Sequence, residues 1–153
     1  MEVFVFDLDF TLWNAGDTWC SETNPPYVWQ EGKLHDQSGR WIRLYPETLE
    51  VLNFLKSRNK LTAIASRTHQ PEWAKKLLQI FNLESFFILK EIYPGSKVLH
   101  LTKIKEQINF PADKIVFFDD EERNIQEVSA LDILSVKVND GINLDMISQF
   151  VRD

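Results

Sequence analysis

Two aspartates, Asp7 and Asp9, directly follow the apolar run 3–6 and precede Thr11. An uninterrupted apolar run is typical of a parallel β-strand that is covered on both faces. Carboxylates at the C-terminal end of such a strand lie where open α/β sheets bind their ligands. Two ionised carboxylates about 4 Å apart repel by roughly 4 kcal/mol at an effective dielectric constant of about 20, so the pair requires a shared proton or a bound cation. The alternative interpretation is an Asp-rich turn without chemistry, because Asp also favours turns for local reasons.

Three further polar segments follow apolar runs later in the chain. They are Ser66-Arg67-Thr68 after 61–65, Lys97 after 86–89 by way of Tyr93-Pro94-Gly95-Ser96, and Asp119-Asp120 after 115–118. Because the C-terminal ends of parallel strands lie at one edge of a sheet, we expect these residues to meet the first aspartate pair in one crevice. Each segment alone has an ordinary explanation as a helix cap, a solvated residue or a turn. Their common placement predicts a shared site.

These residue types fit phosphoryl transfer. Mg²⁺ prefers hard oxygen ligands and is commonly held by carboxylates together with a substrate phosphate, so Asp7, Asp9 and Asp119 are candidate ligands. An Asp carboxylate can also accept a phosphoryl group and form an aspartyl-phosphate. Lys97 would neutralise charge on the transferring group, and Ser66 would bind a phosphate oxygen.

The elements that must position these residues alternate between strand-like and helix-like segments after residue 46. Short apolar runs predict strands at 3–6, 61–65, 86–89, 115–118 and 133–138. Amphipathic patterns predict five helices. They cover residues 46–58, a segment that begins at Pro71 with Trp73 and Leu77 facing inward, a segment that begins at Ser96, and residues 125–131 and 144–151. Repeated βα units of this size predict right-handed crossovers and a mostly parallel sheet.

Residues 14–45 interrupt this alternation. They contain three tryptophans and the turn-forming Asn24-Pro25-Pro26 and Ser38-Gly39, which indicates an insertion of loops with a small hairpin. An insertion after the first strand would overhang the strand ends, where loops commonly carry recognition. Because the insertion is too short to be a separate domain, we expect residues 1–153 to form a single domain with a minimal cap.

The composition restricts the class of protein. With 17 Lys and Arg against 23 Asp and Glu, the net charge is −6, which is unlike that of a general nucleic-acid binder. Cys20 is the only cysteine, so neither an intrachain disulfide nor a cysteine zinc site is expected. The sequence has no apolar stretch of about 18 residues and no signal-peptide pattern at its N-terminus, so we expect no membrane association and a cytoplasmic protein.

Four longer motifs carry a family resemblance. They are Phe6-Asp7-Leu8-Asp9-Phe10-Thr11-Leu12-Trp13, Ala65-Ser66-Arg67-Thr68, Glu91-Ile92-Tyr93-Pro94-Gly95-Ser96-Lys97 and Phe117-Phe118-Asp119-Asp120-Glu121. In this order they resemble the magnesium-dependent phosphatases of the haloacid dehalogenase superfamily, over about residues 3–141. The resemblance implies a three-layer Rossmann-like fold and a Mg²⁺-dependent phosphomonoester hydrolase.

The resemblance also implies a role for each matched residue. Asp7 would be the nucleophile and a metal ligand, and Asp9 would protonate the leaving group and then activate water. The Asp9 backbone carbonyl would also contact the metal, and Asp119 would complete the metal shell. Phosphate would be bound by Thr11, Ser66, Arg67 and Lys97, with Thr11 also supporting the loop and Lys97 also stabilising charge. Asp120 would orient Lys97 or a metal-bound water. An Asp at position 9 favours a phosphatase over a dehalogenase, because a leaving alkoxide needs a proton donor.

The substrate is less determined than the chemistry. Asn24-Pro25-Pro26-Tyr27 is similar to the family pattern, but the rest of 14–37 diverges from it. The family is associated with sugar phosphates and with phosphotyrosine, so a small phosphorylated molecule and a phosphotyrosine protein are both expected partners. The sequence does not decide whether His69 or the tryptophans contact the substrate.

Three other functions use similar residues. A receiver-like signalling domain would also phosphorylate an Asp beside an acidic pair and a Lys, but it has no neighbouring acid such as Asp9 to drive hydrolysis. A phosphotransferase would share the intermediate and transfer it to a hydroxyl group. A catalytically silent phosphoprotein-binding module would need no nucleophile.

Overall fold

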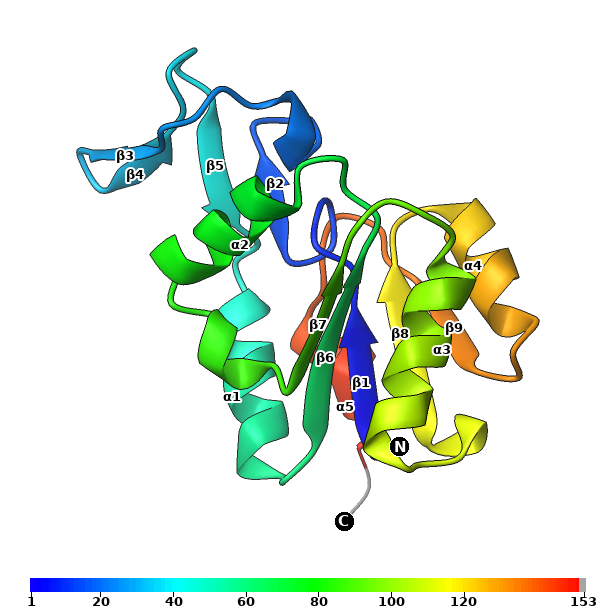
Figure 1. The fold of residues 1–153 in the computed structure, drawn as a ribbon. Helices are drawn as coiled ribbons and strands as arrows, with labels where there is room; N and C mark the ends of the chain where they lie inside the picture. Colours follow the sequence, from blue (N-terminus) through cyan, green and yellow to red (C-terminus); the bar gives the residue numbers. More distant parts are fainter. Residues whose placement is uncertain (152–153) are drawn as a thin grey trace.

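Five parallel strands form the main sheet of the computed structural model, which describes residues 1–151 (Figure 1). In spatial order the strands are β7 (Leu89–Ile92), β6 (Leu61–Ser66), β1 (Val3–Phe6), β8 (Ile115–Asp119) and β9 (Leu134–Lys137). Every neighbouring pair is parallel. The predicted parallel sheet is therefore confirmed, and the C-terminal ends of β6, β1 and β8 lie side by side.

The central strand β1 is buried on both faces. Val5 pairs with Ala63 on β6 and with Phe117 on β8. Side chains alternate along the strand, so Phe4 and Phe6 belong to one core cluster while Val3 and Val5 belong to another. The uninterrupted apolar run of the sequence reflects this double burial.

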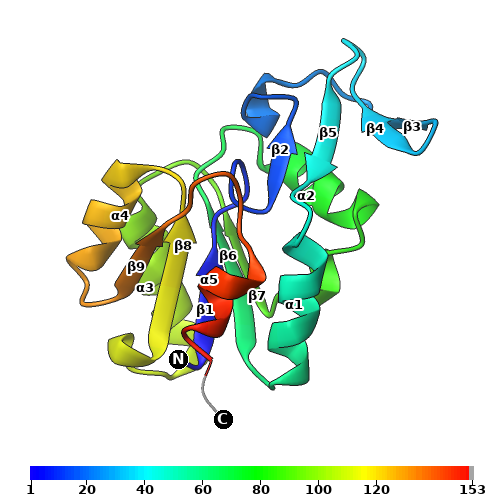
Figure 2. The same ribbon diagram turned by 180° about the vertical axis from the view of Figure 1, so that it is seen from behind.

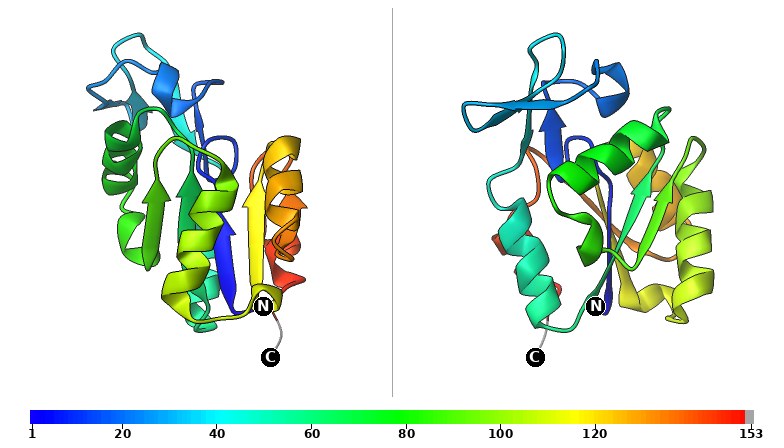
Figure 3. Two further views of the ribbon diagram at one scale, coloured as in Figure 1. Left: turned by 45° about the vertical axis from the view of Figure 1, so that its right-hand side comes forward. Right: turned by 60° about the vertical axis from the view of Figure 1, so that its left-hand side comes forward.

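Helices cover both faces of the main sheet. They are α1 (Thr48–Ser57), α2 (Pro71–Ile80), α3 (Lys97–Ile108), α4 (Glu122–Ser129) and α5 (Leu144–Ser148). Side chains of α3 and α4 pack with the Val3 and Val5 cluster, whereas those of α1, α2 and α5 pack with the Phe4 and Phe6 cluster. The two layers are seen from opposite sides in Figures 1 and 2, and the left view of Figure 3 shows the sheet between them. The chain thus has the three-layer Rossmann-like fold that the resemblance implied.

The insertion is larger in structure than the small hairpin predicted for it. It forms an antiparallel sheet of four short strands in the order β2 (Trp13–Ala15), β5 (Trp41–Leu44), β4 (Lys33–His35) and β3 (Val28–Gln30). A short 3₁₀ helix, η1 (Cys20–Glu22), precedes β3. Strands of three or four residues are too short to show a period of two, which explains why the sequence pattern missed them. This small sheet stands over the C-terminal ends of the main strands (Figures 1 and 3).

The third main strand lies three residues later in the chain than predicted. The apolar run 86–89 contains the end of the 3₁₀ helix η2 (Glu84–Phe86), and β7 begins only at Leu89. Phe87 is buried in the core next to the sheet, whereas Ile88 is half exposed. Phe86, Phe87 and Leu89 pack against the two core clusters, which accounts for most of the apolar run. Strand β7 lies at the sheet edge and includes the polar Lys90 and Glu91.

The other predicted elements are present with small shifts in their ends. Pro71 is the first residue of α2, and Ser96 caps α3 by accepting a hydrogen bond from the Val98 N–H at 3.2 Å. The last helix is shorter than predicted, because α5 ends at Ser148. The remaining 3₁₀ helix, η3 (Ala112–Lys114), leads into β8. No helix in the described part of the chain has the length and apolar character needed to span a bilayer.

Candidate active site

The two aspartates of the first motif lie in a tight loop at the end of β1. The Asp7 N–H donates to the Phe118 carbonyl on β8 at 3.0 Å, which ties the start of the loop to the sheet. The N–H groups of Thr11 and Leu12 both donate to the Leu8 carbonyl, at 3.1 and 2.9 Å. This turn leaves Asp7 and Asp9 only 9% and 8% exposed. Their carboxylates are therefore held at the sheet edge and largely shielded from solvent.

Thr11 is fully buried behind Asp7. Its Oγ1 donates to Asp7 Oδ2 at 3.3 Å, and its carbonyl accepts a hydrogen bond from the Ile142 N–H at 3.1 Å. Its hydroxyl group thus contacts the carboxylate of Asp7, while the phosphate binding expected of Thr11 stays a prediction.

Lys97 lies beneath the same carboxylates. It is the first residue of α3 and is fully buried, with its Nζ 3.1 Å from Asp7 Oδ1, 2.6 Å from Asp119 Oδ2 and 2.8 Å from the Ala65 carbonyl. Burial alone would lower the pKa of Lys97, but the carboxylates of Asp7 and Asp119 raise it above its usual value. The side chain therefore stays charged and links the ends of β1, β6 and β8.

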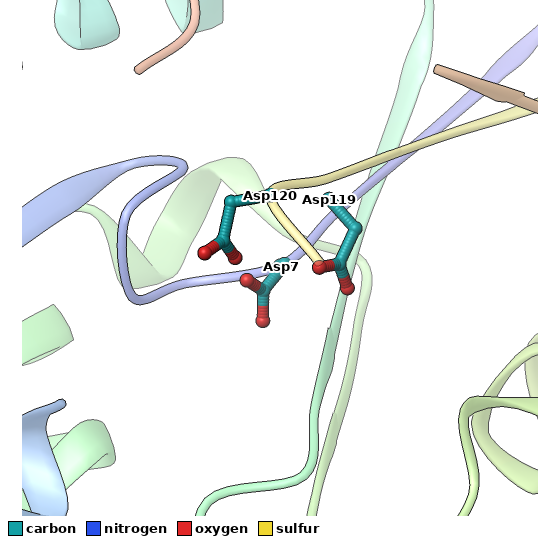
Figure 4. Close-up of side chains that lie close together, drawn as sticks. All are labelled: Asp7, Asp119 and Asp120. Atoms are coloured by element: carbon teal, nitrogen blue, oxygen red, sulfur yellow. The ribbon is translucent and has the colours of Figure 1, made fainter. Parts of the chain in front are cut away.

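Three carboxylates gather at the ends of β1 and β8. Oxygen atoms of Asp7, Asp119 and Asp120 all lie within 4.8 Å of one another, and the side chains point toward one another in Figure 4. Burial, followed by the charge of Asp119, raises the pKa of Asp7 well above its usual value although Lys97 opposes the shift. Burial also raises the pKa of Asp120 to about 6. Three carboxylates against one ammonium group would leave an excess of negative charge, which a divalent cation or added protons would balance.

The donor chemistry of this cluster fits Mg²⁺. All three side chains offer hard oxygen atoms, and Asp119 is oriented by hydrogen bonds from the Glu121 N–H to Oδ1 at 2.9 Å and from Asn124 Nδ2 to Oδ2 at 3.1 Å. Asp120 joins Asp7 and Asp119 in the cluster, whereas the sequence suggested a role for it only in orientation. The side chain of Asp9 is outside this cluster, and the contact expected from its backbone carbonyl stays a prediction.

Asp9 has a different environment from Asp7. Its Oδ1 accepts hydrogen bonds from Trp13 Nε1 at 2.8 Å and from the Cys20 N–H at 2.9 Å. Burial raises the pKa of Asp9 to about 6, although these hydrogen bonds and the charge of Lys97 oppose the shift. A carboxyl group of this kind can hold a proton near neutral pH and release it, as a general acid must.

A cavity of about 250 Å³ opens over these residues. Of the predicted site residues, it is lined by Asp7, Asp9, Ser66, Arg67 and Asp120. The other three, Thr11, Lys97 and Asp119, are fully buried beside it: Thr11 and Lys97 contact the Asp7 carboxylate, and Asp119 contacts Lys97. The parallel sheet thus brings together residues more than 100 positions apart in the chain, as their positions after the strands predicted.

Part of the cavity wall is polar and cationic. Ser66 ends β6 and its Oγ accepts a hydrogen bond from the Thr68 N–H at 3.3 Å. Arg67 Nη1 donates to Asn124 Oδ1 at 2.8 Å and lies 3.5 Å from Glu127 Oε2, which holds the guanidinium at the cavity wall. Hydroxyl and guanidinium donors that line a cavity are suited to binding phosphate oxygens.

Several site residues were not predicted from the sequence. Asn124 contacts both Arg67 and Asp119, and its place in the first turn of α4 beside the acidic motif is the only signal that could have suggested it. Trp13 and the backbone of Cys20 contact Asp9. Trp13 is the last residue of the first family motif but was given no role there, and no pattern marks Cys20. His69 and Trp19 line the cavity, and contact of either with substrate stays a prediction.

Comparison with known proteins places these motifs in a family. The family model described as Acid Phosphatase matches residues 1–153. The chain is 42% identical over 147 residues to Magnesium-dependent phosphatase 1 of Homo sapiens, covering 95% of this chain and 82% of the human protein. It is 31% identical over 154 residues to a HAD-like hydrolase superfamily protein of Schizosaccharomyces pombe, covering 94% of this chain and 89% of that one.

Solved structures share the fold at low sequence identity. A haloacid dehalogenase-like hydrolase from Streptococcus pneumoniae matches with a TM-score of 0.68 at 11% identity, covering 100% of this chain and 92% of that chain. The N-terminal part of a Bacteroides fragilis protein, which contains a phosphatase domain complexed with Mg, matches with a TM-score of 0.67 at 18% identity, covering 91% of this chain and 36% of that chain. At these identities the likeness establishes the fold.

Proposed function

The chain belongs to the Acid Phosphatase family and to the magnesium-dependent phosphatases of the haloacid dehalogenase superfamily, and from this membership we propose that it hydrolyses phosphomonoesters through an aspartyl-phosphate on Asp7. The observation that carries the proposal is the pairing of Asp7 with Asp9 in one cavity. Burial raises the pKa of both carboxyl groups, but Asp7 lies beside the buried ammonium group of Lys97 and within the acidic cluster, where a bound divalent cation would favour its ionised form. Asp9 lies outside that cluster, and its pKa, raised to about 6, lets it carry a proton. Two carboxyl groups in such different environments are suited to two different roles.

The first half-reaction transfers the phosphoryl group to the protein. A carboxylate oxygen of Asp7 attacks phosphorus, the bond between phosphorus and the ester oxygen breaks, and the proton of Asp9 moves to that oxygen to give a neutral alcohol. Ser66 and Arg67 hold the non-bridging phosphate oxygens from the cavity wall. Lys97 keeps Asp7 oriented through its contact with Oδ1.

The second half-reaction releases phosphate. Asp9, now ionised, takes a proton from water while the water oxygen attacks phosphorus, and the bond to the Asp7 carboxylate breaks to free inorganic phosphate. Asp7, Asp119 and Asp120 would hold Mg²⁺, together with the backbone carbonyl of Asp9. When bound, the ion neutralises the carboxylates and the phosphate that approaches them.

The substrate we propose is a sugar phosphate or phosphotyrosine, the latter either free or on a protein. The cavity supports this choice, because it combines cationic donors with the indole of Trp19, which is 52% exposed. An exposed aromatic surface beside a phosphate site can stack on the flat face of a ring. The cytoplasmic location expected from the sequence stays a prediction.

The test is phosphate release from para-nitrophenyl phosphate, with Mg²⁺ or with EDTA. We expect metal-dependent turnover by the wild type and a loss of at least about 1,000-fold in Asp7→Asn, because the nucleophile is removed. Asp113→Asn is the matched control, since Asp113 is exposed in η3 at the opposite end of β8. A folded wild type without turnover in Mg²⁺ would contradict the proposal.

The intermediate needs its own measurement. In Asp9→Asn the first step can still proceed with a good leaving group, but no base activates water, so hydroxylamine-sensitive phosphate should accumulate on the protein and be absent from Asp7→Asn. A stable aspartyl-phosphate in the wild type would instead support the receiver-like alternative. Transfer of phosphate to an added sugar would support the phosphotransferase alternative.

A further inference from the structure

Two N–H groups, one at the start of β2 and one at the start of η1, donate hydrogen bonds to the same oxygen of the Asp9 carboxylate. Trp13 Nε1, on the first residue of β2, lies 2.8 Å from Oδ1, and the N–H of Cys20, the first residue of η1, lies 2.9 Å from it. Within residues 1–151, no hydrogen bond from a nitrogen or oxygen donor to Oδ2 is found. The Cys20 thiol also lies near this carboxyl group, but a thiol is a weak donor. The two oxygens of Asp9 are therefore not equivalent.

We propose that Trp13 and the backbone N–H of Cys20 are positioning groups that orient Asp9 so that Oδ2 transfers the proton in catalysis. The inference rests on the proposed function. An oxygen that accepts two N–H donors at these distances has both lone pairs engaged, so a proton on this carboxyl group resides on Oδ2. That proton passes to the ester oxygen as the bond to phosphorus breaks, and Oδ2 then accepts the proton of the attacking water.

The structure holds Trp13 rigidly enough for this role. Its side chain is fully buried, its ring lies 6.2 Å from that of Phe81 on the end of α2, and its backbone pairs with Leu44 on β5. A carboxyl group with rotational freedom would spend most of its time in orientations that cannot reach the ester oxygen. The insertion therefore contributes to proton transfer itself as well as to the cavity wall.

A purely structural role for Trp13 makes a different prediction. If Trp13 only fills the core, its replacement perturbs the whole site and slows all substrates alike. If it positions the acid, its replacement slows mainly those substrates whose leaving group needs a proton. The ratio of kcat/KM for an alkyl phosphate to that for para-nitrophenyl phosphate separates the two roles, because kcat/KM covers the steps up to departure of the leaving group.

The experiment compares Trp13→Phe with Trp29→Phe in the presence of Mg²⁺. Trp29 lies in the same small sheet, is exposed and also contacts Phe81, so it controls for loss of an indole from the insertion. We expect Trp13→Phe to lower kcat/KM for the alkyl phosphate by about 10- to 100-fold. For para-nitrophenyl phosphate we expect less than about a threefold loss, since its leaving group departs without a proton. Trp29→Phe should leave the ratio unchanged.

A double-mutant cycle with Asp9→Ala completes the test. A residue that acts through Asp9 has nothing to position once that side chain is gone, so Trp13→Phe should not change the ratio further in the Asp9→Ala background. Equal losses on both substrates, or a change in the ratio that persists without Asp9, would overturn the inference. Absence of wild-type hydrolysis would overturn the proposed function and this inference together.

Cys20→Pro provides a second variant in case Trp13→Phe does not fold. Proline is tolerated at the first residue of a helix, and the preceding Trp19 has the extended ψ of 149° that proline requires. The change removes the N–H that binds Asp9, so it should lower the same ratio in the same direction. An unchanged ratio in folded Cys20→Pro would contradict the role of this N–H.

Discussion

Replacement of Lys97 by Met should destabilise the protein strongly when no divalent cation is present. Lys97 Nζ lies 3.1 Å from Asp7 Oδ1 and 2.6 Å from Asp119 Oδ2, and its side chain is fully buried. At an effective dielectric constant of about 20, these distances correspond to gross attractions of about 5 and about 6 kcal/mol. Desolvation of the ions offsets most of that gain, but removal of one partner leaves buried carboxylates uncompensated. We therefore expect the free energy of unfolding to fall by about 3–5 kcal/mol.

Urea unfolding measures this loss in EDTA and again with saturating Mg²⁺. In EDTA the urea midpoint of Lys97→Met should fall by roughly 1–3 M, given typical denaturant slopes for small proteins. Mg²⁺ should stabilise the variant more than the wild type, because the ion binds the folded acidic cluster and no longer meets the repulsion of the ammonium group. The difference between the two proteins should therefore shrink when the metal is added.

The same substitution at an exposed ion pair is the control. Lys75 Nζ lies 3.1 Å from Glu72 Oε1, but the two side chains are 50% and 83% exposed, so Lys75→Met should cost less than about 0.5 kcal/mol. The upper range for exposed ion pairs is about 1 kcal/mol, so a smaller loss for Lys97→Met in EDTA would contradict the role of Lys97 as a buried counter-charge. Stabilisation of the variant by Mg²⁺ that is smaller than that of the wild type would contradict this role of Lys97 as well.

Three further substitutions test the charge and backbone arguments. Burial raises the pKa of Asp120 to about 6. In EDTA, Asp120→Asn should therefore exceed the wild type in stability, by a margin that grows between about pH 4 and about pH 6 in urea titrations. Burial opposes ionisation of Asp36, but three backbone N–H groups and Arg40 lower its pKa below 3.8. Asp36→Ala should thus lose about 2 kcal/mol or more at neutral pH and less as the pH falls below about 4, measured by thermal unfolding. At Gly141, φ is +81° and an added Cβ would clash with the Tyr45 ring, whereas Gly39 has φ +84° and open space. Gly141→Ala should consequently cost more than about 2 kcal/mol and Gly39→Ala about 1–2 kcal/mol, and equal costs would contradict the steric argument.

The sequence predicted the part of the site that depends on strand ends. Asp7, Ser66 and Asp119 each follow or end an apolar run, and parallel pairing alone places such positions at one edge. The error in the bounds of β7 did not affect the predicted position of Lys97, because Lys97 is placed by the start of α3 and not by the strand itself. Errors of a few residues along a strand are thus tolerated when a capped helix fixes the functional side chain.

The contacts that the sequence did not predict depend on loop geometry. Trp13 and Cys20 reach Asp9 only because the chain turns at Phe10, which has φ +62°, and because η1 returns over the end of β1. Neither periodicity nor propensity specifies such a return, since both describe regular elements. Asn124 was not predicted for a related reason. An Asn in the first turn of a helix is common in helices that belong to no functional site.

The acidic cluster shows why a functional site can oppose stability. Asp7, Asp119 and Asp120 place three carboxylates within 4.8 Å, with Lys97 as the ammonium group among them. A sequence selected only for stability would replace at least one of these acids, because like charges in a buried position cost free energy. The rest of the sheet follows the apolar packing that stability favours, so the departure from that packing occurs at the candidate site. Cation binding would convert this repulsion into attraction, and the folded protein is then most stable in the state that is ready to bind phosphate.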